Sequence, residues 1–305
     1  MLNADIPTLN ATFGITRQIT FVNGPGDLPM VSIQNSAAEA TITLQGAHIL
    51  SFQPHDQQPV LWVSQHALFE AGKGIRGGIP IVFPWFGPHP TDPSKPQHGF
   101  ARTMVWQVLG TSAGAEGTTQ VRLGLNDTDQ TRELWPQAFA LEYVVTVGST
   151  LEAELIVRNT DEAAYTWTGA LHSYFTVGDV RQIAIRGLDG TMYLDKVDAM
   201  QRKTQHGELT FDSETDRIYL DTDATCDIHD PALQRRIQVA KQGSRSTVVW
   251  NPWIDKARAL ADFGDDEYLG MVCVETANAA ADAVTLAPGA EHRLKAIITA
   301  TSDVA

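Results

Sequence analysis

The sequence predicts an all-β protein with the architecture of a large β-sandwich, and three observations lead to this fold class. Apolar and polar residues alternate with a period of two in several short runs, which is typical of strands with one buried face. Only residues 255–262 (DKARALAD) have the pattern of a helix, and this run is short. No repeat of fixed period and no low-complexity linker divides the chain. We therefore expect a single domain over residues 1–305.

The expected strands follow one another along the chain, with Gly, Asp, Asn or Pro in the gaps between them. The runs with alternation or with many β-branched and aromatic residues are 40–45, 121–125, 141–147 (LEYVVTV), 151–157, 246–250 (STVVW) and 292–301 (HRLKAIITAT). Residues 221–227 (DTDATCD) have some of the spacing of a calcium loop. Cys226 stands where such a loop needs Gly for its sharp turn, so we interpret this run as an acidic surface turn.

Composition limits the partners that the chain can have. The chain is 43% hydrophobic and 19% charged, which is typical of a globular protein with a sizeable core. Asp and Glu number 36 against 22 Lys and Arg, which gives a formal net charge of -14. This charge repels nucleic acid and anionic membrane surfaces, so we expect neither as a partner. An anionic ligand must instead be bound by a local cluster of basic residues.

The two cysteines and the first residues suggest a cytoplasmic protein. Cys226 and Cys273 are too few for a disulfide framework or a zinc site, and we expect both to be buried thiols. The N-terminal residues lack a basic segment followed by an apolar run, and no apolar segment of 18 residues occurs in the chain. We therefore predict no signal peptide and no membrane span.

A loop rich in proline and glycine precedes a group of polar residues. Residues 77–96 (GGIPIVFPWFGPHPTDPSKP) lead directly into 97–102 (QHGFAR). Each proline fixes φ and each glycine permits turns that other residues resist, so this loop should have a defined path. Such a loop can hold Gln97, His98 and Arg102 in fixed positions.

Three further residues stand in unusual surroundings. His172 lies among apolar residues in GALHSYF, where the usual interpretation is a core histidine with one hydrogen-bond partner. Glu275 lies in the strand-like run MVCVETAN, where burial would raise its pKa and suit it as a base; a structural salt bridge is an equally good explanation. Arg76 is flanked by glycines in GIRGGIP and could reach a ligand or form a surface ion pair.

Seven motifs together resemble one known family. They are GIRGGIPIVFPWFG, QHGFAR, ALHSYF, ETDRIY, VVWNPW, CVETAN and LAPGAEHRL, and they occur in the family's order from about residue 70 to residue 295. In this respect the chain closely resembles the hexose-6-phosphate mutarotases (glucose-6-phosphate 1-epimerases) of the aldose 1-epimerase superfamily. Each motif alone is weak, but seven in register are a specific signal.

The resemblance implies a galactose mutarotase-like supersandwich, a large β-sandwich with a sugar pocket on one concave sheet. It implies that His172 and Glu275 are the catalytic residues and that the substrate is bound by Arg76, Gln97, His98, Arg102 and Asp216. Trp85, Phe86 and Trp250 are candidates for an apolar wall of the pocket. We expect no metal, no other cofactor and a monomeric protein.

The implied reaction is the interconversion of the α and β anomers of a hexose 6-phosphate, glucose 6-phosphate foremost. One group removes a proton from the anomeric hydroxyl while another protonates the ring oxygen, which suits a carboxylate and a histidine. The alternatives are an epimerase for free aldoses, a non-catalytic carbohydrate-binding protein, and a hydrolase or lyase on a related sandwich. The presence of both His172 and Glu275 argues against the non-catalytic alternative.

Overall fold

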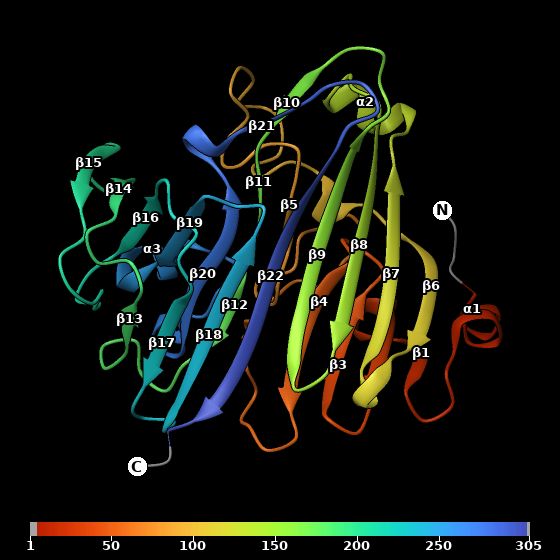
Figure 1. The fold of residues 1–305 in the computed structure, drawn as a ribbon, viewed down its shortest axis with the longest axis horizontal. Helices are drawn as coiled ribbons and strands as arrows, with labels where there is room; N and C mark the ends of the chain where they lie inside the picture. Colours follow the sequence, from red (N-terminus) through yellow and green to blue (C-terminus); the bar gives the residue numbers. More distant parts are fainter. Residues whose placement is uncertain (1–4, 304–305) are drawn as a thin grey trace.

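Antiparallel strands are the main secondary structure in a computed structural model that describes residues 5–303 (Figure 1). Most of the long strands belong to an eight-stranded sheet, called here the β9 sheet. Its order is β13 (Ala184–Arg186), β17 (Cys226–Asp230), β18 (Arg235–Gln242), β22 (Glu291–Ser302), β9 (Thr150–Asn159), β8 (Phe139–Val147), β7 (Thr119–Asn126) and β6 (Gln107–Ala113).

A second eight-stranded sheet, called here the β20 sheet, consists mostly of shorter strands. Its order is β15 (Gln201–Thr204), β14 (Met192–Asp195), β16 (Thr215–Tyr219), β19 (Ser246–Asn251), β20 (Met271–Asn278), β11 (Gly169–Leu171) and β5 (Ile81–Val82), while β12 (Tyr174–Thr176) pairs with β20 beside β11.

Two smaller sheets complete the strands. A four-stranded sheet contains β1 (Ile19–Asn23), β2 (Pro29–Gln34), β3 (Ala38–Thr43) and β4 (His48–Pro54). A two-stranded ribbon pairs β10 (Tyr165–Trp167) with β21 (Val284–Leu286).

The sheets form two layers around a hydrophobic core. Figure 1 shows the long strands of the β9 sheet across one layer, and behind it the four-stranded sheet on one side and the β20 sheet on the other. Contacts between β3 and β8 and between β20 and β22 join the layers. Alternate residues of β8 are buried, as expected for a strand that packs against a core with one face. The predicted β-sandwich is confirmed.

Every residue of β20 is buried, and this determines the surroundings of its one acidic side chain. Successive side chains of a strand point to opposite faces, so Glu275 shares a face with Cys273 and Ala277. Val272 and Val274 point to the other face and belong to the main hydrophobic cluster. The sequence prediction that both cysteines are buried is confirmed, since Cys226 is 1% and Cys273 0% exposed.

The helix predicted over residues 255–262 exists, but its predicted bounds were wrong. Helix α3 covers Trp253–Ala259, and Leu260 is already extended with its N–H bonded to the Ala257 carbonyl. Two other helices, α1 (Ile6–Phe13) and α2 (Asp129–Leu134), were not expected. Both are too short for a clear 3.6-residue period and depend on N-terminal capping by side chains, as Thr128 does for α2. The 3₁₀ turns among residues 5–303 are η1 (Pro25–Asp27), η2 (Ala101–Thr103), η3 (Ala115–Gly117), η4 (Glu267–Gly270) and η5 (Ala280–Asp282).

The predicted acidic turn at residues 221–227 is only partly a surface turn. Asp221 and Asp223 are exposed, whereas Cys226 and Asp227 are buried at the start of β17, where Asp227 pairs with Arg236.

Within residues 5–303, no helix is long and apolar enough to cross a membrane.

Candidate active site

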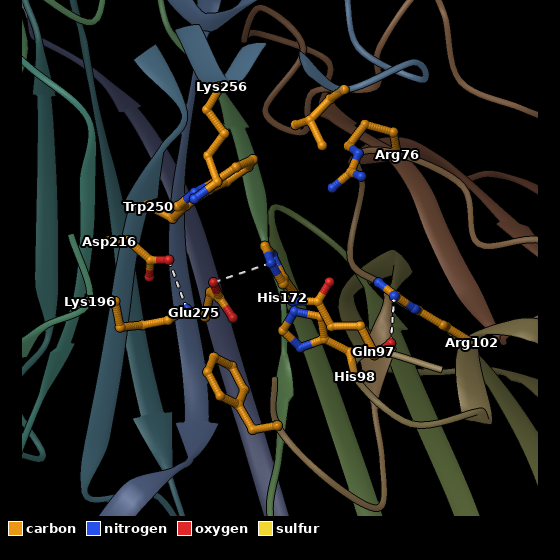
Figure 2. A pocket seen from close by; sticks show the side chains of 12 residues that line it. Arg76, Gln97, His98, Arg102, His172, Lys196, Asp216, Trp250, Lys256 and Glu275 are labelled. Atoms are coloured by element: carbon orange, nitrogen blue, oxygen red, sulfur yellow. Dashed lines mark hydrogen bonds and ion pairs between the residues drawn. The ribbon is translucent and has the colours of Figure 1, made fainter. Parts of the chain in front are cut away.

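All seven residues that the sequence singled out line one pocket against the β20 sheet (Figure 2). They come from segments that lie far apart in the sequence. Asp216 and Glu275 lie on strands β16 and β20, and His172 lies between β11 and β12. Loops beside the sheet supply Arg76, Gln97 and His98, and the 3₁₀ turn η2 supplies Arg102.

The proline-rich loop places Gln97 and His98 through an unusual backbone. His98 has a φ of +66° and its N–H donates to the Gly87 carbonyl at 2.7 Å. Gly99 follows with a φ of +71°, and a Cβ atom there would overlap the Phe83 carbonyl oxygen. Only glycine fits this position, which explains its place in the QHGFAR motif.

The Nδ1 atom of His98 accepts a hydrogen bond from the Gly87 N–H at 3.2 Å. Burial, with the nearby cations Arg102, Lys196 and Arg76, lowers the pKa of His98 to about 3, so the ring is neutral at physiological pH. A neutral imidazole that accepts at Nδ1 carries its proton at Nε2. His98 therefore offers an N–H donor at Nε2 beside Gln97.

His172 and Glu275 contact each other in the centre of the pocket. The His172 Nε2 and Glu275 Oε1 atoms lie 3.3 Å apart, and the residues are 7% and 1% exposed. The His172 ring stacks on Tyr174 at 4.7 Å with an interplanar angle of 11°, and it forms a T-shaped contact with Trp250. Its backbone N–H donates to the Pro80 carbonyl at 3.1 Å. The imidazole thus has a fixed orientation toward the carboxyl group.

Burial changes the pKa values of this pair in opposite directions. It raises the pKa of Glu275 well above the usual value and lowers the pKa of His172 well below the usual value. The cations around His98 lower the pKa of His172 further. Both groups therefore favour their uncharged forms in the folded protein. Within residues 5–303, the Glu275 Oε2 and His172 Nδ1 atoms are buried and have no hydrogen-bond partner. One proton passed across the contact would convert this uncharged pair into a carboxylate and an imidazolium, a base and an acid side by side.

The two arginines lie on the side of the pocket opposite Asp216 (Figure 2). Arg76 donates to both carboxylate oxygens of Asp262, at 3.2 and 3.1 Å, and to the Tyr174 hydroxyl at 3.2 Å. Although burial opposes its charge, Tyr174 and Asp262 raise the pKa of Arg76, which stays cationic. Arg102 donates from Nη2 to the Gln97 carbonyl at 2.8 Å. The expected surface ion pair of Arg76 exists, but it lies at the pocket.

The sequence did not single out three charged or aromatic residues of the site. Lys196 lines the pocket and pairs with Asp216, with 2.7 Å between Nζ and Oδ2; burial raises the pKa of this carboxyl against the effect of the lysine. Lys256 of α3 lines it as well, and Tyr174 connects Arg76 to the His172 ring. A lysine after a strand or on a short helix has no pattern that distinguishes it from a solvated surface lysine.

Of the three aromatic residues proposed for the wall, two line the pocket. Phe86 and Trp250 do so, and Lys196 lies over the Phe86 ring at 5.6 Å. The suggestion for Trp85 was wrong. Its ring is buried against His89 and its indole N–H donates to the Pro96 carbonyl at 2.9 Å, so it holds the proline-rich loop together.

A metal centre was not expected, and among residues 5–303 no group of three or more His, Cys, Asp or Glu side chains could hold an ion. The polar groups of the pocket instead suit a small polar molecule. They comprise an acid–base pair in the centre, amide and imidazole donors, a carboxylate and several cations. The two aromatic rings offer an apolar surface of the kind on which sugars pack.

Comparison with known proteins gives the family. The family model described as aldose 1-epimerase matches residues 29–299. A Salmonella typhimurium protein named "Putative glucose-6-phosphate 1-epimerase" is 38% identical over 84% of this chain and 85% of its own length. A protein of the same name from Cenchrus ciliaris is 35% identical over 86% of this chain and 81% of its own. The crystal structure of a "putative mutarotase" from Salmonella typhimurium superposes with a TM-score of 0.89 at 33% identity, covering 97% of this chain and 99% of that one. By its sequence and its fold, this chain belongs to the aldose 1-epimerase family.

Proposed function

We propose that this enzyme interconverts the α and β anomers of hexose 6-phosphates, with glucose 6-phosphate as the foremost substrate. The observation that carries the proposal is the buried contact between His172 and Glu275, 3.3 Å apart, in a pocket that also contains Arg76 and Arg102. The family supports the reaction, and the names of the Salmonella and Cenchrus relatives support a phosphorylated substrate.

Glu275 and His172 act as base and acid. Transfer of the Glu275 proton to His172 across their 3.3 Å contact first gives a carboxylate and an imidazolium. The carboxylate then removes the proton from the anomeric hydroxyl while the imidazolium donates a proton to the ring oxygen, and the bond between the anomeric carbon and the ring oxygen breaks. The aldehyde then rotates, and the ring hydroxyl attacks its other face. During closure the roles reverse: His172 takes the proton from the attacking hydroxyl and Glu275 returns one to the new anomeric oxygen. Both hydrogen positions are restored, so the cycle needs no other reactant.

The surroundings of the pair suit this exchange. Burial raises the pKa of the carboxyl and lowers the pKa of the imidazole, so ionised Glu275 is a stronger base and protonated His172 a stronger acid than the free side chains. The two reacting oxygens of the sugar are bonded to one carbon atom. A pair of groups already in contact can therefore reach both of them at once.

The other pocket residues hold the sugar while its anomeric end reacts. Asp216 accepts hydrogen bonds from hydroxyl groups, and the Gln97 amide and the His98 Nε2–H donate to them. Phe86 and Trp250 contact the apolar faces of the ring. Fixing the sugar away from its anomeric carbon leaves the opened aldehyde free to rotate.

Arg76 and Arg102 bind the 6-phosphate. Guanidinium groups match phosphate oxygens in geometry and keep their charge when buried. The repulsion from the net charge of -14 is screened beyond about 8 Å at physiological salt, so these local contacts decide binding.

Magnetisation transfer between the α and β signals of glucose 6-phosphate tests the reaction directly. We expect the protein to increase the exchange rate, and to do so more for glucose 6-phosphate than for glucose. Equal kcat/KM for both sugars would indicate the alternative, an epimerase of free aldoses. No increase for any sugar would indicate a non-catalytic carbohydrate-binding protein.

We further propose that residues 1–305 form one domain and that the protein is a cytoplasmic monomer. One hydrophobic cluster contains residues from Ile19 to Ala300, which supports a single cooperative unit. A single unfolding transition and a sedimentation mass near 33.3 kDa are the expected results.

A further inference from the structure

Four cationic side chains line the pocket, and three of them have a carboxylate partner. The pairs and their shortest distances between nitrogen and oxygen are Lys196 and Asp216 at 2.7 Å, Lys256 and Glu214 at 2.6 Å, and Arg76 and Asp262 at 3.1 Å. In the part of the chain that the structure describes, Arg102 alone among the four forms no ion pair, and its Nη2 donates to a backbone carbonyl. Most of the positive charge available to an anion is thus already compensated.

Asp262 engages Arg76 in the way that a phosphate group would. It accepts from Nε and from Nη2, so its two oxygens occupy one edge of the guanidinium fork. Tyr174 accepts from Nη1. Paired donation along one edge is also how arginine binds phosphate. A phosphate that enters the pocket therefore meets an arginine whose bidentate edge is already occupied by an anion.

The position of Asp262 is fixed by the fold. It lies in the turn after α3, one residue before Phe263, which is 3% exposed and packs on Trp62 with ring centroids 5.0 Å apart. The Glu267 carboxylate then fastens the turn, because it accepts from the Gly264 N–H at 2.7 Å and from the Ser64 hydroxyl at 2.6 Å. The contact with Arg76 is therefore held in place by packing and hydrogen bonds on both sides.

We propose that Asp262 is a specificity-determining residue, which competes with the phosphate group of the substrate for Arg76 and so limits how strongly the pocket prefers phosphorylated over free sugars. The inference rests on the proposed function, because it assumes that the pocket binds a sugar phosphate. A carboxylate beside a phosphate site weakens phosphate binding by like-charge repulsion and by occupying the arginine. A neutral sugar experiences neither effect.

A different role for Asp262 predicts the opposite result. If it only orients Arg76, then its removal leaves the guanidinium misplaced and phosphate binds more weakly. The sign of the change in phosphate affinity therefore separates competition from positioning. Loss of folding would move the affinities for phosphate and for sugar together.

The test uses Asp262→Asn and Asp262→Ala, with Asp262→Glu as the variant that keeps the charge. Asp227→Asn is the matched control, because Asp227 also binds an arginine, Arg236, through both oxygens but lies on β17 away from the pocket. Calorimetry with inorganic phosphate measures anion binding without turnover. The ratio of kcat/KM for glucose 6-phosphate to that for glucose measures the preference during catalysis.

We expect Asp262→Asn and Asp262→Ala to bind phosphate about tenfold more tightly than the parent, a change of ~1.4 kcal/mol, and to raise the kcat/KM ratio by a similar factor. Asp227→Asn should stay within about twofold of the parent, and Asp262→Glu, which keeps the charge, should gain less phosphate affinity than the two neutral variants. Unchanged or weaker phosphate binding in both neutral variants would overturn the proposal. The proposed function has a separate test: it is wrong if the parent does not accelerate anomer exchange. In that case the phosphate titration still decides whether Asp262 competes for Arg76.

Discussion

Replacing Glu275 with glutamine should remove catalysis and stabilise the fold at the same time. Glutamine keeps the shape of the side chain but cannot take a proton from the anomeric hydroxyl. A positioned general base contributes about 10²–10⁴-fold, so anomer exchange should slow by at least about 10²-fold. The other carboxylate that lines the pocket, Asp216, is paired with Lys196, with 2.7 Å between Oδ2 and Nζ.

The expected change in stability follows from the raised pKa of Glu275. A carboxyl whose pKa is higher in the folded than in the unfolded protein binds more protons when folded, so stability falls as the pH rises above the unfolded value near 4.5. His172, with a lowered pKa, acts oppositely, but only below its unfolded value of 6.5. Above pH 6.5, Glu275 is therefore the one member of this pair that still makes stability depend on pH. The slope is at most 2.303RT, about 1.4 kcal/mol per pH unit, which is the limit for one proton.

Urea unfolding of the parent and of Glu275→Gln at several pH values between 6.5 and 8.5 measures this difference, and magnetisation transfer measures exchange. We expect the advantage in stability of Glu275→Gln to grow with pH while its activity stays low. Near-normal exchange would refute the role of Glu275 as the base. Parallel stability curves for the two proteins would refute the inference that its carboxyl has a strongly raised pKa.

The remaining predictions concern the other pocket groups. His172→Asn should slow exchange by at least about 10²-fold without unfolding the protein, and near-normal exchange would contradict its role as the acid. Arg102→Ala should narrow the preference for glucose 6-phosphate over glucose by roughly 10- to 150-fold, because one charge-assisted hydrogen bond contributes about 1.5–3 kcal/mol; an unchanged ratio of kcat/KM values would favour the free-aldose alternative. Arg76→Ala should narrow this preference less, because Asp262 already compensates the charge of Arg76. Activity should survive prolonged dialysis against a chelator, and activity that is lost and then restored by a divalent ion would show that a metal takes part.

Much of the fold could be predicted because strands leave a local signal. The alternation in residues 151–157 and 292–301 corresponds to β9 and β22, whose neighbours in the sheet repeat the same pattern. The period of two arises in each strand separately, from the pleat and one buried face, and needs no knowledge of partners. Strand order and the division into several sheets depend on contacts between distant segments, and no local pattern contains them.

The site residues divide in the same way. His172 and Glu275 attracted attention because a titratable group in an apolar run is unusual, and the resemblance to a family suggested their roles. Neither observation shows that their side chains lie 3.3 Å apart, which requires β11 and β12, the strands that flank His172, both to pair with β20.

By itself the sequence determined the fold class, the burial of both cysteines and the seven polar residues that line the pocket. Only the tertiary structure decided which charges compensate one another there. Lys196, Lys256 and Asp262 have ordinary surroundings in the sequence, and the expected helix through residue 262 concealed the turn that carries Asp262. The physical reason is that a charge acts over a few ångströms in space, and the partners within that range, 186 residues apart for Arg76 and Asp262, are chosen by packing and not by the neighbouring sequence.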